Sequence, residues 1–404
     1  MSRPPRMIDS VVVGAGPAGL ATSAALSERA VEHVVLERGR AGSSWRTQRW
    51  DSLRLNNPGW MNRMLGDQPR DSYLTGGEVV QRLEKLAAGC PLREGIRVAR
   101  LAPDAQGWAL RTTEGDLRAR TVVVATGGEN VPRTPALAGA LSNRIAQYHA
   151  ADYRNPALLP EGAVLVVGSA QSGCQIAEEL LTADREVILA TNPVGRAPAR
   201  HRGRDTVQWL ADWGFFDQRA RDLPDPSVMR AAQPLLAPGG RSMSLQALAR
   251  AGATLVGRLV AVDDEQVRFD DSAPANVAAG DAFAARIRTM LDETITRAGF
   301  DMPAVELDEA DIPVDLDPPA ALDLAAGGVG STVWCTGYTG DFSWLDPALI
   351  DADGKPRHSD GAGPVPGLWY VGLRWLTHRA SGNLFGFPRD AAAIAEAVRD
   401  HLRR

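Results

Sequence analysis

The sequence predicts an α/β protein built from two doubly wound domains, the second inserted into the first. One strand–turn–helix–strand unit occurs twice, starting at residues 8 and 163. In each copy, short apolar runs flank an amphipathic segment, as in buried parallel strands joined by a helix. Residues 1–155 and 326–404 are expected to form one domain, and residues 156–325 the domain inserted into it.

Composition narrows the class of protein. The 404 residues carry a net charge of -5, which argues against a nucleic-acid binder with a basic face. No apolar run is long enough for a transmembrane helix, and we expect no signal peptide at the N-terminus. We therefore expect a cytoplasmic protein. The three cysteines are isolated in the sequence, which suits a reducing compartment. The six histidines show no paired ligand spacing, so no metal is expected.

Local patterns predict the remaining elements. Residues 78–88 are expected to form a helix, and residues 96–120 a small antiparallel meander followed by a separate buried strand at 121–125. Apolar spacing predicts a helix over residues 281–298 and another over residues 388–404. Residues 301–320 carry seven acidic residues and no Lys or Arg, which is typical of a solvated connection rather than a binding site.

The first glycine turn has the context of a dinucleotide-binding loop. Gly14, Gly16 and Gly19 follow a strand and open a helix. Gly14 permits the tight turn, Gly16 lets the backbone approach a pyrophosphate, and Gly19 lets helix and strand pack closely. Glu37 ends the next strand, where a carboxylate accepts hydrogen bonds from an adenosine ribose and repels a 2′-phosphate. This loop is therefore expected to bind FAD or NAD rather than NADP.

The second turn repeats the design with a different charge pattern. It runs through Gly168, Ser169, Ala170, Gln171, Ser172 and Gly173, with alanine at the middle glycine position. The following strand ends in Thr191 and Asn192 without a carboxylate, and residues 195–204 supply four arginines, Arg196 and Arg200 among them. Guanidinium groups form charge-assisted forks with phosphate oxygens, so we expect NADPH here. The alternative is a solvated basic loop.

Taken together, the motifs resemble those of the flavin-containing monooxygenases, the group that includes plant indole-pyruvate monooxygenases. The resemblance rests on GAGPAG at residues 14–19, GSSWR at 42–46, LRLNNP at 53–58, VATG at 124–127, GSAQSG at 168–173, WCTGY at 334–338 and the C-terminal tail from residue 367. It implies a Rossmann-like FAD domain into which a Rossmann-like NADPH domain is inserted. Besides the two loops and Glu37, the resemblance assigns cofactor contacts to Pro17, Ala18, Arg38, Ser44, Trp45, Arg54, Ala125, Thr126, Gly127, Thr336, Gly337, Gly386, Phe387 and Asp390.

The resemblance also implies a reaction. NADPH would reduce the flavin, dioxygen would add to give a C4a-hydroperoxyflavin, and a small soft nucleophile would be oxygenated at N, S or C. Asn56 matches the position beside the reactive edge of the flavin, although an Asx turn before Pro58 is the alternative. Asp390 either lies near the flavin pyrimidine or only favours the helix start. Dioxygen and a small molecule are the expected partners of a monomer or homodimer, with no nucleic acid or membrane.

The family's linker motif is altered here. Asn143 and Ile145 replace its Phe and Gly, while His149 and Tyr153 remain. This makes a Baeyer–Villiger monooxygenase less favoured and leaves His149 either catalytic or an ordinary linker histidine. The motifs also allow an NADPH oxidase or amine oxidase without oxygen insertion, and a non-catalytic flavin sensor. A disulfide reductase is disfavoured because it needs a Cys-x-x-Cys pair at the flavin, and no two cysteines are close in sequence.

Overall fold

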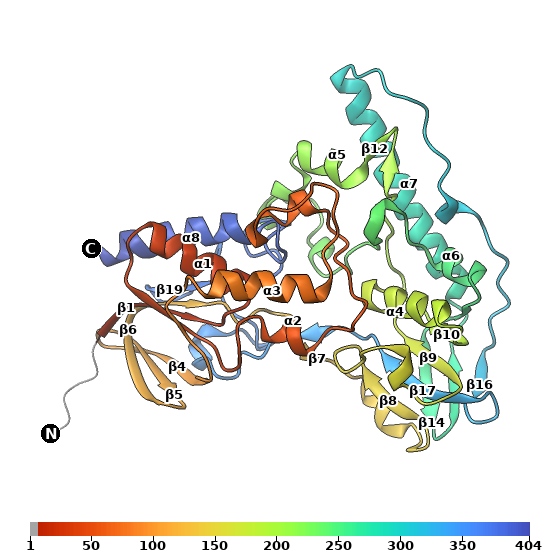
Figure 1. The fold of residues 1–404 in the computed structure, drawn as a ribbon, viewed down its shortest axis with the longest axis horizontal. Coiled ribbons are helices and arrows are strands. Elements are labelled where there is room, and N and C mark those ends of the chain that lie inside the picture. The colour runs from red at the N-terminus through yellow and green to blue at the C-terminus, as the bar shows by residue number, and fades with distance from the viewer. Residues whose placement is uncertain (1–6) are drawn as a thin grey trace.

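The computed structural model describes residues 7–404, so the N-terminal segment 1–6, where we expect no signal peptide, lies outside the described residues. Two sheets form the cores of two bodies that lie side by side (Figure 1). This confirms the α/β fold class with two doubly wound units.

The first sheet has seven strands in the order β3-β2-β1-β6-β5-β4, with β19 paired to β6. β1, β2, β3 and β19 run parallel to their neighbours, and β4, β5 and β6 form an antiparallel meander. The strands are β1 (Met7–Val13), β2 (His33–Leu36), β3 (Leu92–Arg93), β4 (Val98–Asp104), β5 (Gly107–Thr112), β6 (Gly115–Val124) and β19 (Leu368–Tyr370). Its core also contains residues of α1 (Pro17–Glu28), α3 (Gly76–Ala87) and α8 (Phe387–Leu402).

The second sheet has five parallel strands in the order β13-β10-β9-β17-β8. They are β8 (Ala146–His149), β9 (Ala163–Val167), β10 (Val187–Ala190), β13 (Thr254–Val256) and β17 (Val329–Trp334). Strand β9 is buried along its whole length, as its run of Ala, Val and Leu requires for a strand covered on both faces. Helices α4 (Gln171–Thr182) and α6 (Leu245–Arg250) share its core.

Several further elements complete the fold. They are α2 (Ser43–Thr47), α5 (Thr206–Asp212), α7 (Ala273–Ala298), and the small sheet of β14 (Leu259–Asp263), β15 (Gln266–Phe269) and β16 (Ala321–Asp323). A two-residue hairpin pair, β11 (Arg200–His201) and β12 (Arg204–Asp205), precedes α5. Short 3-10 turns, including Gly59–Met61 and Phe215–Asp217, occupy the connections.

A short antiparallel ribbon marks the crossing between the two bodies. It consists of β7 (Val131–Pro132) and β18 (Tyr338–Thr339). Arg133 strengthens it by donating from Nε and Nη2 to the carbonyl of Thr336, at 3.2 and 3.0 Å. Strands β8 and β17 already belong to the second sheet, which favours domain boundaries before Ala146 and after Trp334. The ranges 1–155, 156–325 and 326–404 stay a prediction.

Two sequence expectations were wrong in detail. The third strand of the meander and the buried strand at 121–125 are one strand, β6, which pairs antiparallel with β5 at its start and parallel with β1. Helix α7 begins at Ala273, eight residues before the expected start. Its first two turns are rich in Ala, which carries no apolar periodicity, and Pro274 at an early helical position was the available start signal.

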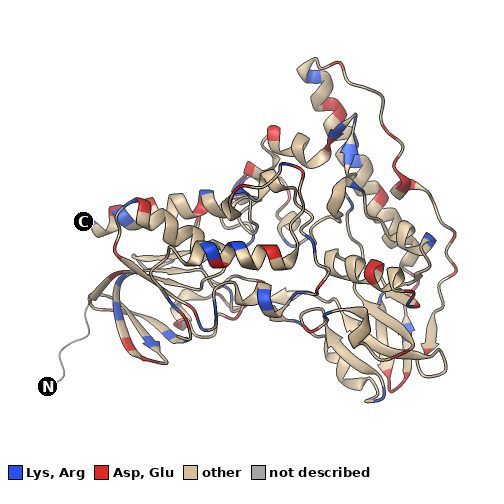
Figure 2. Ribbon diagram, in the orientation of Figure 1, with Lys and Arg blue, Asp and Glu red and all other residues tan. Residues whose placement is uncertain are grey.

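The acidic connection at 301–320 is also more than a solvated loop. It runs along the outer side of the second body, where red segments follow it in Figure 2. Asp308 and Asp311 form ion pairs with Arg288 of α7, at 3.4 and 2.8 Å. The acidic charge is therefore partly neutralised by arginines of the same domain.

Candidate active site

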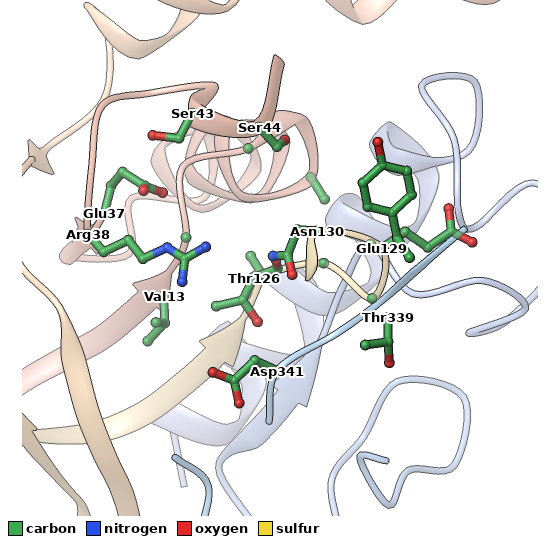
Figure 3. A pocket seen from close by; sticks show the side chains of 18 of the residues that line it. Val13, Glu37, Arg38, Ser43, Ser44, Thr126, Glu129, Asn130, Thr339 and Asp341 are labelled. Atoms are coloured by element: carbon green, nitrogen blue, oxygen red, sulfur yellow. The ribbon is translucent and has the colours of Figure 1, made fainter. Parts of the chain in front are cut away.

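A cavity of about 950 Å³ opens at the carboxyl ends of the strands of the first sheet. This is the edge at which ligands bind in open α/β sheets. Figure 3 shows Glu37 and Arg38 after β2, Thr126 after β6, and Asp341 from the C-terminal part of the chain around the same space. The cavity therefore joins segments that lie far apart in the sequence.

The first glycine turn has the geometry that the sequence predicts. Gly14 has φ +107°, and a Cβ there would lie 2.7 Å from the Ala125 carbonyl oxygen. A Cβ on Gly19 would lie 2.0 Å from the Gly14 oxygen, so helix α1 packs directly on the turn. Gly16 differs, because a Cβ there would meet no protein atom within 4 Å. The missing side chain at Gly16 leaves open space beside the cavity, as a group bound against the backbone requires.

Helix α1 begins at this open space without a side-chain cap. Gly16 is its N-cap residue, and no side chain accepts from the first amides of the helix. Free amide groups and the positive end of the helix dipole favour an anion such as a pyrophosphate. Glu37 is buried, and its two carboxylate oxygens accept from the amides of Ala15 and Gly39, both at 2.9 Å. The carboxylate thus holds the turn while lining the cavity.

The structure brings most of the predicted residues of the first loop together. Those that line the cavity are Gly14, Gly16, Pro17, Ala18, Glu37, Arg38, Ser44, Ala125, Thr126, Gly127 and Phe387. Trp45, Arg54, Asn56, Thr336, Gly337, Gly386 and Asp390 do not line it. The cofactor contacts of both groups stay predictions.

Sequence reasoning missed part of the cavity wall. The additional lining residues include Ser43, Gln48, Glu129, Asn130, Tyr338, Thr339, Asp341, Gly372, Arg374 and Gly382. Half of them follow strand ends that the motifs mark: Glu129 and Asn130 follow the VATG strand end, and Tyr338, Thr339 and Asp341 follow the WCTG strand end. Polar residues directly after a buried strand were the available signal, because strand ends meet at one edge of the sheet.

Asp390, in the first turn of α8, supports the cavity wall without lining it. Asp390 is 2% exposed, accepts from the hydroxyl of Thr377 and lies 3.3 Å from Nε2 of His378. Burial raises the pKa of Asp390, but the Thr377 hydroxyl and the neighbouring His378 and Ser381 side chains outweigh it, so its pKa lies below the usual value. The side chain therefore ties α8 to the segment before it, a role that neither sequence interpretation of Asp390 had proposed.

His149 has the environment of a linker histidine. Its Nδ1 accepts from the amide of Ala151 at 3.0 Å, which places the proton on Nε2, and Nε2 donates to the Gly337 carbonyl at 3.1 Å. Burial lowers the pKa of His149, so the neutral ring is favoured. The Tyr153 hydroxyl donates to Glu179 of α4 at 2.8 Å. Both ring nitrogens of His149 are used at the crossing between the sheets, which favours the structural role over the catalytic one.

The second glycine turn copies the first. Gly168 again has φ +107°, and a Cβ on Gly173 would lie 1.8 Å from the Gly168 oxygen. Ala170 is the N-cap residue of α4, and this helix also lacks a side-chain cap. The hydroxyl of Ser169 accepts from the Asn192 amide at 3.0 Å, which holds the turn against the end of β10. The first backbone N–H groups of α4 can therefore bind an anion, as those of α1 can.

Three predicted residues of this second loop have protein partners of their own. The Thr191 hydroxyl is buried and donates to the Val256 carbonyl at 2.7 Å. The side-chain amide of Gln171 donates from Nε2 to the backbone carbonyl of Leu236 at 2.6 Å, and its Oε1 accepts from the backbone amide of Leu236 at 3.1 Å. Arg196 is only 3% exposed and forms ion pairs with Asp281 at 2.7 Å and with Asp311. Arg196 is therefore not a free cation. Arg200 is 54% exposed and lies 4.0 Å from Glu306, and its contact with a 2′-phosphate stays a prediction.

The cysteines do not form a redox site at the cavity. Cys174 and Cys335 belong to the core of the second body, and burial raises the pKa of both thiols. Neither lines the cavity at the first loop, and Cys90 lies apart in the first body. Within residues 7–404, no group of three His, Cys, Asp or Glu side chains is arranged to hold a metal ion.

Each glycine turn lies at the carboxyl end of a parallel strand and leads into a helix. Two such turns define an oxidoreductase built on paired nucleotide-binding domains. Residues 11–214 match the family described as pyridine nucleotide-disulphide oxidoreductase, and the chain belongs to this family. It is 27% identical over 403 residues to an uncharacterized CzcO-like oxidoreductase of Geobacillus kaustophilus, covering 98% of this chain and 99% of that protein.

Two further relatives bear on the monooxygenase resemblance. An indole-3-pyruvate monooxygenase of Oryza sativa, YUCCA1, is 35% identical over 180 residues, which cover 42% of this chain and 44% of that protein. A flavin-containing monooxygenase from Stenotrophomonas maltophilia has the same fold, with a TM-score of 0.65, 21% identity, and 97% and 98% of the two chains covered. The resemblance to the flavin-containing monooxygenases is thus supported by sequence similarity to a monooxygenase over part of the chain and by a shared fold over nearly all of it.

Proposed function

We propose that the chain is an FAD-dependent, NADPH-consuming monooxygenase that transfers one oxygen atom from dioxygen to a small soft nucleophile at N, S or C. The observation that carries this proposal is the cavity at Gly16, where backbone amides, the Glu37 carboxylate and the start of α8 meet. The match of 42% of the chain to a named indole-3-pyruvate monooxygenase supports the same reaction class.

The residues at the cavity fit FAD. The free amides at the start of α1 would hold the pyrophosphate, and Glu37 and Arg38 lie where the adenosine end would follow β2. Ser44 and Phe387 line the same cavity, and the ring system would extend toward Phe387 at the start of α8. Bound FAD supplies the chemistry that links a two-electron donor to dioxygen. The chain's own contribution is to orient both ligands and to exclude water from the reacting centre.

Arg200 would set the preference for NADPH over NADH. We expect Arg200→Gln to raise the KM for NADPH about tenfold and to leave the KM for NADH within about twofold, because one charged hydrogen bond to phosphate is lost. Steady-state NAD(P)H oxidation measures both constants. Arg144→Gln is the matched control, since Arg144 is 84% exposed and its ion pair with Glu265 lies away from residues 195–204. Equal effects of Arg200→Gln on the two cofactors would show that the 2′-phosphate binds elsewhere.

The competing functions differ in where the oxygen atoms of dioxygen go. An NADPH oxidase or amine oxidase reduces dioxygen to peroxide without insertion, and a Baeyer–Villiger enzyme inserts oxygen beside a carbonyl. The altered linker at Asn143 and Ile145 disfavours the Baeyer–Villiger enzyme. Asn56 belongs to the connection from α2 to α3 in the chain and is half-buried. It does not line the cavity, so its role beside the flavin stays a proposal.

Isotope labelling separates these reactions. FAD-loaded protein is supplied with NADPH, labelled dioxygen and a panel of amines, thioethers, 2-oxo acids and ketones. We expect one labelled oxygen atom in the product of at least one substrate, with NADPH consumed in equal amount. Quantitative hydrogen peroxide with no labelled product from any of the panel would identify an oxidase. Anaerobic NADPH that fails to bleach the flavin would remove the proposal altogether.

Location and assembly are separate from the chemistry of the cavity. Within the described residues 7–404, no helix combines the length and apolar character needed to cross a bilayer. A cytoplasmic location and a monomer or homodimer stay predictions.

A further inference from the structure

Three buried oxygen atoms in the wall of the cavity have no hydrogen-bond donor. They are Oε1 of Gln48, Oγ1 of Thr126 and Oδ1 of Asn130, and all three side chains line the cavity. Among residues 7–404, no donor reaches any of these atoms. Figure 3 shows Thr126 and Asn130 close together beyond the end of β6. A buried acceptor without a donor is costly, which indicates that a group bound in the cavity supplies the missing hydrogen bonds.

The hydrogen bonds of the two amides settle which of their atoms are left over. Nε2 of Gln48 donates to the backbone carbonyl of Asn130 at 2.9 Å, and Nδ2 of Asn130 donates to the backbone carbonyl of Thr126 at 2.5 Å. Because a backbone carbonyl only accepts, each NH2 group must face it, and a flipped amide would lose the bond. The two unpartnered amide atoms are therefore acceptors. Together with the Thr126 hydroxyl they form a cluster that we call the oxygen triad.

The oxygen triad carries no charge. Glu129, which precedes Asn130 in the chain, pairs with Arg374 at 3.6 Å, so its carboxylate already has a counter-ion. An ammonium group at the triad would lose its water without gaining a counter-ion, which is costly. A neutral group with N–H donors, such as a primary amide, gains hydrogen bonds there without this cost. The triad is therefore suited to a carboxamide.

The oxygen triad also lies on the path between the two glycine turns. The backbone amide of Asn130 donates to Thr339 of β18 at 3.1 Å, beside the ribbon at the crossing of the two bodies (Figure 1). Further back in the same segment, a Cβ on Gly168 of the second turn would lie 2.5 Å from the Cys335 carbonyl oxygen. The chain from Cys335 to Tyr338, which lines the cavity, spans at most about 10 Å. A dinucleotide with its pyrophosphate at the second turn can therefore extend its nicotinamide end to the triad.

We propose that the oxygen triad binds the carboxamide of the nicotinamide ring of NADPH. The two N–H groups of the carboxamide donate to Oε1 of Gln48 and Oδ1 of Asn130, and the Thr126 hydroxyl donates to the carboxamide oxygen. These contacts fix the rotation of the ring and its distance from the flavin, while the three residues exchange no proton or electron with it. This inference rests on the proposed function and names the residues that position its hydride donor.

Dinucleotide analogues test the triad. In the 3-acetylpyridine analogue of NADP+, a methyl group replaces the amide NH2, so both N–H donors are lost and the carbonyl remains. Titration of the FAD-loaded full chain, followed by flavin absorbance, should give a Kd for this analogue about tenfold above that for NADP+. 2′,5′-ADP, which has no nicotinamide, reports binding of the adenosine end alone.

Two variants remove different members of the triad. Gln48→Met removes one acceptor and should reduce the tenfold preference for NADP+ to about threefold. Thr126→Val should raise the Kd of NADP+ and of the analogue by the same factor, about fivefold, because both carry the carbonyl. In both variants the Kd of 2′,5′-ADP should stay unchanged, and anaerobic flavin reduction by NADPH should slow about tenfold. Gln106→Met is the control, since Gln106 is exposed in the turn between β4 and β5 and does not line the cavity.

Each outcome decides for or against the triad. Equal affinities of the wild type for NADP+ and the analogue, or an unchanged preference in Gln48→Met, would overturn the inference. Loss of FAD from Thr126→Val would also overturn it, because the triad would then hold the flavin. Gln48→Met also loses its bond to Asn130, so Thr126→Val, whose hydroxyl has no protein partner, decides if Gln48→Met does not load FAD. A wild type that NADPH cannot reduce sinks the proposed function, whereas variants reduced at the wild-type rate sink only this inference.

Discussion

Gly16→Val is expected to abolish FAD binding while leaving the apoprotein folded. Gly16 has φ -75° and ψ -179°, which valine adopts without strain, and its added Cβ meets no protein atom within 4 Å. The valine side chain would instead fill the space in which the pyrophosphate lies against the backbone. Overpacking of this kind costs about 3 kcal/mol, so the Kd for FAD should rise about 100-fold or more. Flavin fluorescence titration measures the Kd, and thermal unfolding of the apoprotein checks the fold.

Two glycine variants give this experiment its contrast. Gly139→Val also places its Cβ in open space, but away from the cavity, and should change neither FAD affinity nor stability by much. Gly19→Ala would bring its Cβ to 2.0 Å from the Gly14 oxygen, so the apoprotein itself should lose stability. A Gly16→Val protein that still binds FAD tightly would mean that the pyrophosphate does not lie at this turn.

Local sequence signals predicted the two nucleotide turns well. Gly14 and Gly19 carry local information, because Gly14 has a positive φ and a Cβ on Gly19 would clash with the Gly14 oxygen of the same turn. Only the contact of Gly14 with Ala125 comes from a distant strand end. Glu37 is also positioned locally, because it reaches back only to the amide of Ala15. The whole unit lies in residues 7–37, so periodicity, turn residues and the terminal acid are read together.

The rest of the site depends on contacts between distant segments. Asp341 and Arg374 line the same cavity as Glu37, yet no spacing rule links residues separated by most of the chain. Arg196 shows the converse error. Its position in a basic stretch indicated a phosphate ligand, whereas its charge is neutralised by Asp281 of α7 and Asp311 of the acidic connection. The sequence showed both charge clusters but not that they face each other.

Asp390 shows how the start of α8 is fixed, and its replacement is expected to have a large effect on stability. Asp390→Asn keeps the shape of the side chain but removes the charge that accepts from Thr377 and faces His378. Hydrogen bonds to a buried charged group contribute about 1.5–3 kcal/mol, so the free energy of unfolding should fall by about 2 kcal/mol near neutral pH. Denaturant unfolding followed by circular dichroism measures it. Asp400→Asn is the control, because Asp400 is 52% exposed in the same helix and should contribute little.

The pH dependence of the same variant gives a sharper test. Because the pKa of Asp390 in the folded chain lies below its usual value of about 3.9, the ionised group stabilises the fold at all pH values above the unfolded pKa. That stability is lost as the pH falls below about 4 and through the folded pKa. The difference in unfolding free energy between wild type and Asp390→Asn should therefore shrink in acid. A difference that stays constant down to pH 3 would show that the Asp390 carboxylate does not hold α8 to residues 377–381 through its charge.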